Sequence, residues 1–146
     1  MNESMVTFQG WIGGAVRLRS AAGTPVASFR VASTPRRFNR TEQTWSDGPT
    51  QWYTVNAWRT LGEHCAASLH QGEPVVVHGR LSQSTWVNGE GIEQTSLEVE
   101  ASFVGHDLSR GITRFAKPAP LQQPTGQTAS TEPSAGTSPT AGEAAA

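Results

Sequence analysis

Four tryptophans of this chain fall on the polar side of segments in which apolar and polar residues alternate. In the segment 52–59 the apolar positions are Tyr53, Val55 and Ala57. In an extended strand, Trp52 and Trp58 therefore share the opposite face and lie roughly 20 Å apart. Trp86 and Trp11 have the same relation to the apolar positions of their own segments. Flat, rigid, exposed rings of this kind can stack on other flat apolar plates, such as nucleobases.

Basic side chains lie between and beside these tryptophans. Those that could contact phosphates are Arg30, Arg36, Arg37, Arg40, Arg59 and Arg80. Phe38 lies within the arginine-rich stretch, Trp45 follows it, and the whole stretch is expected to form a loop after the second strand. Arginines interleaved with aromatic rings suit single-stranded nucleic acid, because the rings stack on bases while the cations bind phosphates. An arginine cluster alone is more often just a solvated loop.

A tryptophan on a polar strand face can also arise without a ligand. Such a face can be a subunit interface, or a second layer of core can cover it. Alternation can also slip at a β-bulge, and Gly13-Gly14 makes this a real alternative for Trp11. Four tryptophans with the same behaviour are harder to account for in these ways than one, and they favour ligand stacking.

Alternation with a period of two residues predicts five strands that must position these residues. They span residues 6–12, 26–32, 52–59, 75–86 and 95–104. The core-facing residues of the last strand are expected to be Leu97, Val99, Ala101 and Phe103. Residues 88–91, Asn-Gly-Glu-Gly, supply a hairpin turn between the last two strands.

One helix is expected between the third and fourth strands. Thr60 and Glu63 have the spacing of a capping box at its start. Gly72 lies where a C-terminal cap is expected. The apolar face of the helix consists of Leu61, Cys65 and Leu69. The order β-β-β-α-β-β predicts an all-β domain with one short helix: an OB-fold, which is a five-stranded Greek-key barrel.

Length and composition favour one folded domain followed by a tail. We expect residues 1–110 to form the domain, and residues 111–146, rich in Pro, Ala, Thr and Ser, to be disordered. The net charge is −1, so any attraction for phosphate must come from local clusters of arginine. The sequence has no long apolar run and no apolar signal core, so we expect a cytoplasmic protein without a membrane span.

Metal-binding and catalytic sites find little support in the sequence. Cys65 is the only cysteine, and its place on the apolar helix face predicts a buried, unreactive thiol. The histidines, at positions 64, 70, 78 and 106, are scattered and lack the spacing of metal ligands. No nucleophile elbow or glycine-rich phosphate loop is present. We therefore expect no metal, no cofactor and no enzymatic activity.

The most specific pattern is W-x5-W-R-x-L, followed by the helix, G-x-x-V-x-V-x-G-R-L and Trp86. With GWIGGAVRLRS before it and TSLEVEASFVG after it, the pattern covers nearly all of residues 5–105. On these motifs the chain resembles the bacterial single-stranded DNA-binding proteins, particularly those of actinobacteria. The resemblance implies an OB-fold and a homotetramer. It also implies DNA stacked on Trp52, Trp58 and Trp86, with Phe38 at the early-loop position, whereas Trp11 rests on strand parity alone.

The C-terminus departs from the family pattern. Members typically end in a short acidic tip that closes with Pro-Phe and recruits replication and repair proteins, whereas this sequence ends GEAAA. Recruitment of such partners through a tip is therefore doubtful, and the chain looks like a secondary paralogue.

The expected function is sequence-independent binding and protection of single-stranded DNA in replication, repair or recombination, in association with the nucleoid. The alternative is an OB-fold protein-interaction module, such as a primosome-like component, whose tryptophans contact proteins and whose affinity for nucleic acid is weak. An oligosaccharide-binding OB-fold would also use exposed aromatics, but the arginine-rich stretch argues against it.

Overall fold

The computed structural model describes residues 2–118, and the chain up to Thr113 forms one compact unit. The elements of this unit are β1 Ser4–Ile12, β2 Arg17–Ala21, β3 Thr24–Ser33, β4 Arg36–Asn39, β5 Thr44–Asp47, β6 Gln51–Trp58, α1 Arg59–Ser68, β7 Pro74–Val87 and β8 Glu93–His106. Most of the predicted tail, residues 119–146, lies outside the described residues, so its disorder stays a prediction.

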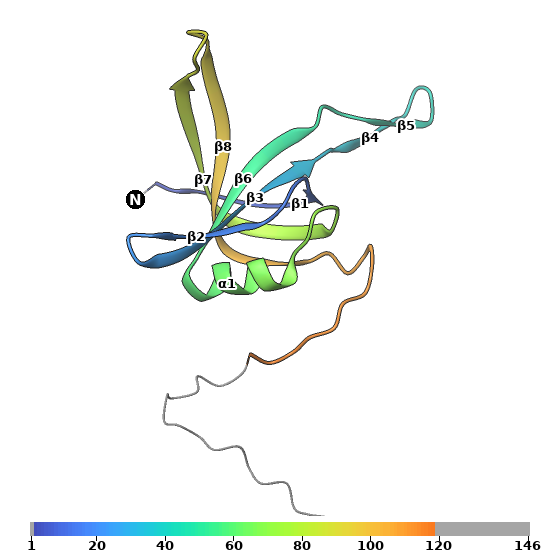
Figure 1. Ribbon diagram of the computed structural model, residues 1–146. Coiled ribbons are helices and arrows are strands. Elements are labelled where there is room, and N and C mark those ends of the chain that lie inside the picture. The colour runs from blue at the N-terminus through green and yellow to red at the C-terminus, as the bar shows by residue number, and fades with distance from the viewer. Residues whose placement is uncertain (1, 119–146) are drawn as a thin grey trace, which may run out of the picture. The chain divides into compact units, whose positions relative to one another are not determined.

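Five of the strands form a small barrel in the order β1-β7-β8-β6-β3 (Figure 1). The ring joins through a short pairing of β1 with β3, in which Trp11 lies opposite Ala32 and Ile12 opposite Val31. Neighbouring ring strands are antiparallel except β6 and β8, which are parallel. A five-stranded barrel with a helix between its third and fourth strands along the chain is an OB-fold, so the predicted fold is confirmed.

The alternating apolar residues of the ring strands fill the barrel as predicted. Those that are almost completely buried include Ala27, Phe29, Val31, Val55, Ala57, Val75, Val77 and Val99. Cys65 of α1 joins this core, and burial raises the pKa of its thiol to about 11. The predicted burial of Cys65 is confirmed, and a thiol with a raised pKa stays protonated at neutral pH, as expected of an unreactive cysteine.

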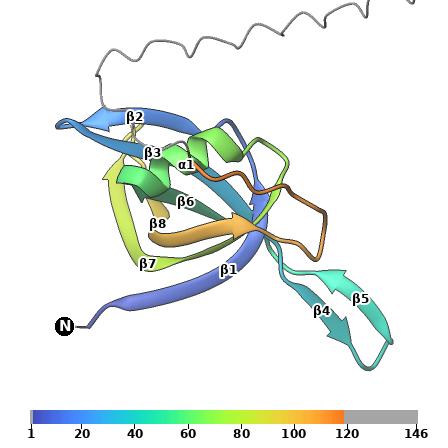
Figure 2. The ribbon, with the colours of Figure 1, turned by 90° about the horizontal axis from the view of Figure 1, so that it is seen from below.

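The helix α1 packs on β3 and β6 at one end of the barrel (Figure 2). Its predicted apolar face is confirmed, because Cys65 and the following Leu69 are buried and Leu61 packs against the core. The predicted capping box is wrong. The helix begins at Arg59, directly after β6, with Trp58 at the N-cap position and no side-chain hydrogen bond. Thr60 already lies inside the first turn, where its hydroxyl cannot serve as the N-cap.

The predicted role of Gly72 as the helix cap is also wrong. The residue after the helix, Leu69, is extended, and its N–H donates to the carbonyl of Cys65 at 2.9 Å. Gly72 lies three residues further on, in the turn into β7, with a φ of 88°. Its N–H donates to the carbonyl of Ile12 at 2.7 Å. A glycine favours this left-handed backbone, which ties the turn to the end of β1.

Two hairpins project from the barrel on the side away from α1 (Figure 1). One is the outer part of β7 and β8, joined by the predicted turn at 88–91, whose Asn88 side chain accepts hydrogen bonds from the N–H groups of Glu90 and Ile92. The other is the β4–β5 hairpin, which pairs Arg36 with Asp47 and Phe38 with Trp45. The prediction of a loop after the second strand is therefore wrong, since this segment forms a hairpin. Its two short strands consist of exposed residues, so they lack the apolar alternation by which a strand is predicted.

The β7–β8 ladder contains a β-bulge, after which the other set of alternating β8 residues faces the core. His78 pairs with Phe103 while Gly79 pairs with Ala101, so Ser102 has no partner. The extra residue moves Phe103 to the outer face, where 55% of it is exposed, and Val104 packs against the core instead. The prediction that Phe103 faces the core is therefore wrong, because a strict period of two does not allow for the extra residue.

Gly62 allows α1 to approach the barrel backbone closely. A Cβ at this position would overlap the carbonyl oxygen of Ala57 and lie 3.0 Å from the backbone nitrogen of Ala27. Helix propensity alone predicts that Gly62→Ala stabilises the protein by about 1 kcal/mol. We expect the opposite, a fall of about 1–3 kcal/mol in the free energy of unfolding measured in urea, because the helix must move off the sheet.

Gly89→Ala is the control for this substitution. Gly89 lies in the β7–β8 turn, with nothing within 4 Å of an added Cβ. Its free energy of unfolding should change by less than about 0.5 kcal/mol. A Gly62→Ala protein as stable as the parent would contradict the close packing of α1 on the barrel.

Candidate nucleic-acid interface

Trp11 and Trp52 belong to one row of side chains across three strands. Trp11 of β1 pairs with Ala32 of β3, and Ala32 pairs in turn with Trp52 of β6. Paired residues point to the same face of a sheet, and two strand spacings separate the backbone positions of Trp11 and Trp52 by about 10 Å. Each indole is 44% exposed. β1 keeps its regular register up to this point, so a slip of parity at Gly13-Gly14 does not account for the exposure of Trp11.

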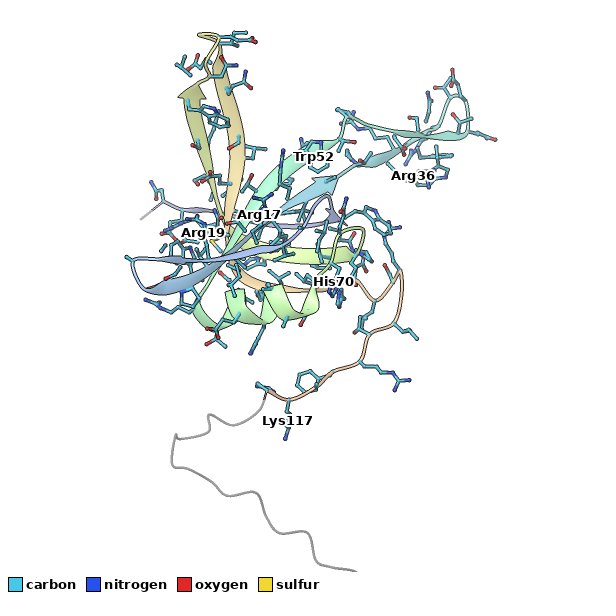
Figure 3. All side chains as sticks on the ribbon, in the orientation of Figure 1. Arg17, Arg19, Arg36, Trp52, His70 and Lys117 are labelled. Atoms are coloured by element: carbon cyan, nitrogen blue, oxygen red, sulfur yellow. The ribbon has the colours of Figure 1, made fainter. Side chains whose placement is uncertain are left out.

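Trp52 lies against both a glycine and an arginine. A Cβ on Gly13 would overlap the six-membered ring of Trp52, so the glycine backbone lies directly against the indole. The guanidinium of Arg30 lies over the Trp52 ring, 4.9 Å from its centroid. A cation at this distance attracts the face of the ring. Trp52 lies on β6 close to the base of the β4–β5 hairpin, which carries Arg36 (Figure 3).

Trp58 lies at the far end of the same face of β6, opposite Val26 of β3, and is 38% exposed. Between the two tryptophans the face is polar, and the hydroxyl of Ser28 donates to the Asn56 side chain at 2.7 Å. Trp58 and Arg59 line a hollow of about 570 Å³. The predicted parity of this strand is confirmed, because its opposite face is the buried one.

Trp86 is on the β7–β8 hairpin, paired with Gln94 and 48% exposed. The bulge does not affect its parity, since the unpaired residue is on β8. β7 pairs with β1 only as far as Leu81, so the ribbon that carries Trp86 consists of β7 and β8 alone.

The β4–β5 hairpin carries a second aromatic group. Phe38 and Trp45 lie opposite each other with ring centroids 5.2 Å apart, and both are exposed. Arg36 lies over the Trp45 ring at 5.7 Å and forms an ion pair with Asp47 at 3.5 Å. The sequence places Trp45 in a loop whose geometry it does not define, and so does not predict this pairing.

The predicted phosphate ligands differ in what surrounds them. Arg37 and Arg40 are exposed on the β4–β5 hairpin and its tip, and Arg59 is exposed at the start of α1. Arg80 differs, because one terminal nitrogen binds Glu3 at 3.1 Å and the other binds Glu100. These carboxylates, Glu3 first, raise the pKa of Arg80. With both terminal nitrogens in ion pairs, Arg80 is the least available of the six.

The outer face also contains an aromatic pair that sequence reasoning misses. Phe103 stacks on His78 with centroids 4.8 Å apart, and the Nδ1 atom of His78 lies 2.6 Å from the Thr7 hydroxyl. Only the bulge at Ser102 brings Phe103 here. A structural signal for the bulge is Gly79, where a Cβ would overlap the carbonyl oxygen of Glu100, but a single glycine in a strand does not identify a bulge from sequence.

Among the described residues, no three His, Cys, Asp or Glu side chains form a group that could hold a metal ion. The helix within that part of the chain is too short and too polar to cross a membrane.

The fold and these side chains define a class of protein: a small OB-fold whose outer face carries exposed aromatic rings beside arginines, as in OB-folds that bind oligonucleotides or oligosaccharides. Residues 3–107 match the model of the Single-strand binding protein family, and the chain belongs to this family. Membership agrees with the prediction that the protein is not an enzyme.

Relatives of this chain include actinobacterial proteins, in agreement with the resemblance seen in the sequence. The chain is 40% identical over 119 residues to Single-stranded DNA-binding protein 1 of Streptomyces coelicolor, covering 82% of this chain and 76% of that protein. It is also 40% identical over 127 residues to the single-stranded DNA-binding protein of Corynebacterium glutamicum, covering 86% of this chain and 54% of that protein.

Two solved structures are similar to this one. The small single-stranded DNA-binding protein from Streptomyces coelicolor is 41% identical, with a TM-score of 0.70, and the match covers 76% of this chain and all of that one. The second single-stranded DNA-binding protein of Mycobacterium smegmatis is 34% identical, with a TM-score of 0.59, and the match covers 80% of this chain and all of that one.

Adjacent glycines allow a sharp test of how Trp52 is positioned. In Gly13→Ala the new methyl group overlaps the Trp52 ring and must displace it, whereas Gly14→Ala has nothing within 4 Å. We expect Gly13→Ala to shift the tryptophan emission maximum and lower affinity for oligo(dT) about 3- to 30-fold, because misplacing one stacking ring loses part of about 1–3 kcal/mol. Gly14→Ala should leave both unchanged, and equal effects from the two substitutions would contradict this contact.

Proposed function

We propose that this protein binds single-stranded DNA without sequence preference by stacking bases on Trp52, Trp58 and Trp86, with Phe38 and Trp11 as further rings. The observation that carries the proposal is that these large aromatic side chains are all between 38% and 48% exposed on the barrel face and its hairpins. Exposed apolar rings cost solubility unless a ligand or partner covers them. The names of the relatives, all single-stranded DNA-binding proteins, support DNA as that ligand.

The phosphates of the bound strand contact arginines beside these rings. The side chains proposed for this role are Arg30, Arg36, Arg37, Arg40 and Arg59. Arg80, which the sequence also favours as a phosphate ligand, is not among them, because its ion pairs with Glu3 and Glu100 favour a structural role. Local arginines must supply the attraction, because the whole chain has a net charge of −1.

The role of the protein is passive. Covering an unpaired strand keeps it from pairing again and from nucleases, which serves replication, repair and recombination in the cytoplasm and at the nucleoid. The family resemblance supports assembly as a homotetramer. Residues 119–146, on which the expectation about an acidic tip rests, lie outside the described residues.

A fluorescence titration with oligo(dT) at low salt tests this function. We expect saturating quenching of tryptophan emission, with affinity falling as salt rises. Trp52→Ala, Trp58→Ala and Trp86→Ala should each weaken binding by roughly 1–3 kcal/mol. Val87→Ala removes another exposed apolar side chain, next to Trp86, and should leave affinity unchanged. Tryptophan variants that bind oligo(dT) like the parent but lose a protein partner would instead support an OB-fold protein-interaction module.

Arg30 and Arg80 form a matched pair for the phosphate contacts, because each alanine substitution removes one positive charge from the same chain. Arg30→Ala should weaken oligo(dT) binding and reduce the slope of log K against log salt concentration by about 0.7, the value for one phosphate contact on a single strand. Arg80→Ala should leave that slope unchanged, since Glu3 and Glu100 already occupy its terminal nitrogens. Equal slopes for the two variants would mean that the ion pairs do not decide which arginine binds phosphate.

A further inference from the structure

The residues that follow β8 form a tight turn anchored to the barrel. The N–H of Asp107 donates to the carbonyl of Pro74 at 3.0 Å, and the Asp107 residue is buried. Its carboxylate accepts hydrogen bonds from the hydroxyl and N–H of Ser109, at 2.6 and 3.0 Å, and these bonds lower the pKa of Asp107. The N–H of Arg110 donates to the Asp107 carbonyl at 3.1 Å, which closes the turn.

This turn places Arg110 against a tryptophan on a different strand. The guanidinium lies 5.3 Å from the centre of the Trp11 ring, within the range of a cation–π contact. Its Nε atom is 3.6 Å from the Asp107 carboxylate. Arg110 is therefore oriented from two sides, by the indole and by the carboxylate, while half of its side chain stays exposed.

Arg110 and Trp11 share a hollow with the base of the β4–β5 hairpin. Its lining includes Thr7, Gln9, Trp11, Thr34, Arg36 and Arg110, and none of the residues that line it is acidic. Its volume is about 730 Å³, within the range of about 300–1,000 Å³ typical of sites for small ligands. The hollow thus combines the aromatic residues Phe8 and Trp11, hydroxyl and amide groups, and two guanidinium groups.

Both arginines keep donors available for a ligand. Each forms its ion pair through Nε, Arg36 with Asp47 at 3.5 Å and Arg110 with Asp107 at 3.6 Å. Arg80 differs from both, because its terminal nitrogens are the atoms that are paired. The terminal nitrogens of a guanidinium are the donors that bind phosphate oxygens in a bidentate manner.

We propose that Trp11, Arg36 and Arg110 form an additional subsite for one nucleotide of a bound single strand, with Arg110 as a phosphate ligand held in place by Trp11. This inference rests on the proposed function and extends it beyond residue 107, where the match to the family model ends. The subsite is continuous with the main face, because Trp11 and Trp52 are joined through Ala32. A strand stacked on Trp52 can therefore continue across β3 to Trp11.

The test compares alanine and lysine substitutions of Arg110 in the full chain, with Arg19→Ala as control. Arg19 is an exposed arginine of β2 and is absent from the lining of the three hollows that contain Trp11, Trp52 and Trp58. Arg110→Ala should weaken oligo(dT) binding about 5- to 30-fold and reduce the salt slope by about 0.7. Arg110→Lys should keep the slope but lose part of the affinity, because an ammonium cannot bind bidentately or stack as a flat group. Arg19→Ala should change affinity less than about twofold.

The outcomes separate this inference from the function on which it rests. If Arg110→Ala binds like Arg19→Ala while Trp52→Ala still weakens binding, the subsite is refuted and the proposed function stands. If neither Trp52→Ala nor Arg110→Ala weakens binding, the function itself fails. If Arg110→Ala proves unstable in a melting experiment, Arg110→Lys decides, since an unchanged affinity there refutes the bidentate contact.

A titration with thymidine monophosphate distinguishes a strand from a free nucleotide as the ligand. We expect no measurable binding of the monophosphate at concentrations at which oligo(dT) saturates the protein, because a single nucleotide makes only the contacts of one subsite. Tight binding of the monophosphate that Arg110→Ala abolishes would overturn the proposal in favour of a mononucleotide site.

Discussion

The junction at the end of β1 is the interaction on which the rest of the domain depends. Within three residues, Trp11 to Gly13, the backbone is bound to β3, to the turn before β7 and to the start of β7 itself. The N–H of Ile12 donates to the carbonyl of Glu73, and the carbonyl of Ile12 accepts from the N–H of Gly72. The N–H of Gly13 donates to the carbonyl of Arg30. The same short segment joins the ring, anchors the exit from α1 and sets the positions of both Trp11 and Trp52. Structure and site therefore have a common origin here.

A cluster of polar side chains around Glu73 stabilises this junction. The Glu73 carboxylate lies 3.0 Å from Nε2 of His106 and accepts the backbone N–H of His70 at 2.8 Å. These interactions, with His106 the largest contributor, lower the pKa of Glu73. A carboxyl whose pKa is lower in the folded state stabilises the fold above its ordinary pKa, and this contribution is lost as the pH falls through the lower value. The turn before β7 is thus best held at neutral pH, where the carboxylate is ionised.

The barrel is predictable from sequence because each of its strands buries one face. Apolar residues therefore alternate with polar ones along each strand, as around the buried Phe29, Val55 and Val99. The same alternation identifies Trp52, Trp58 and Trp86 as outward residues. It fails where no buried face exists, as in the β4–β5 hairpin, and where Ser102 adds a residue without a sequence marker. Arg110 escapes prediction for a different reason. It reaches Trp11 only through the fold, from the opposite end of the domain's sequence, and no local pattern records such a contact.

The two hairpins carry much of the exposed aromatic surface on ribbons of only two strands. A two-stranded ribbon without a core beneath it is marginally stable in water. The free energy of opening for amide hydrogen exchange should be lower in these ribbons than in the barrel, because the ribbons can unfold locally. The binding free energy of a ligand that stacks on Trp86 or on the Phe38–Trp45 pair must then offset the entropy lost when these ribbons become ordered. If these rings stack on bases as proposed, part of the stacking energy offsets that entropy, and we expect the hairpins to adapt to different strand paths at some cost in affinity.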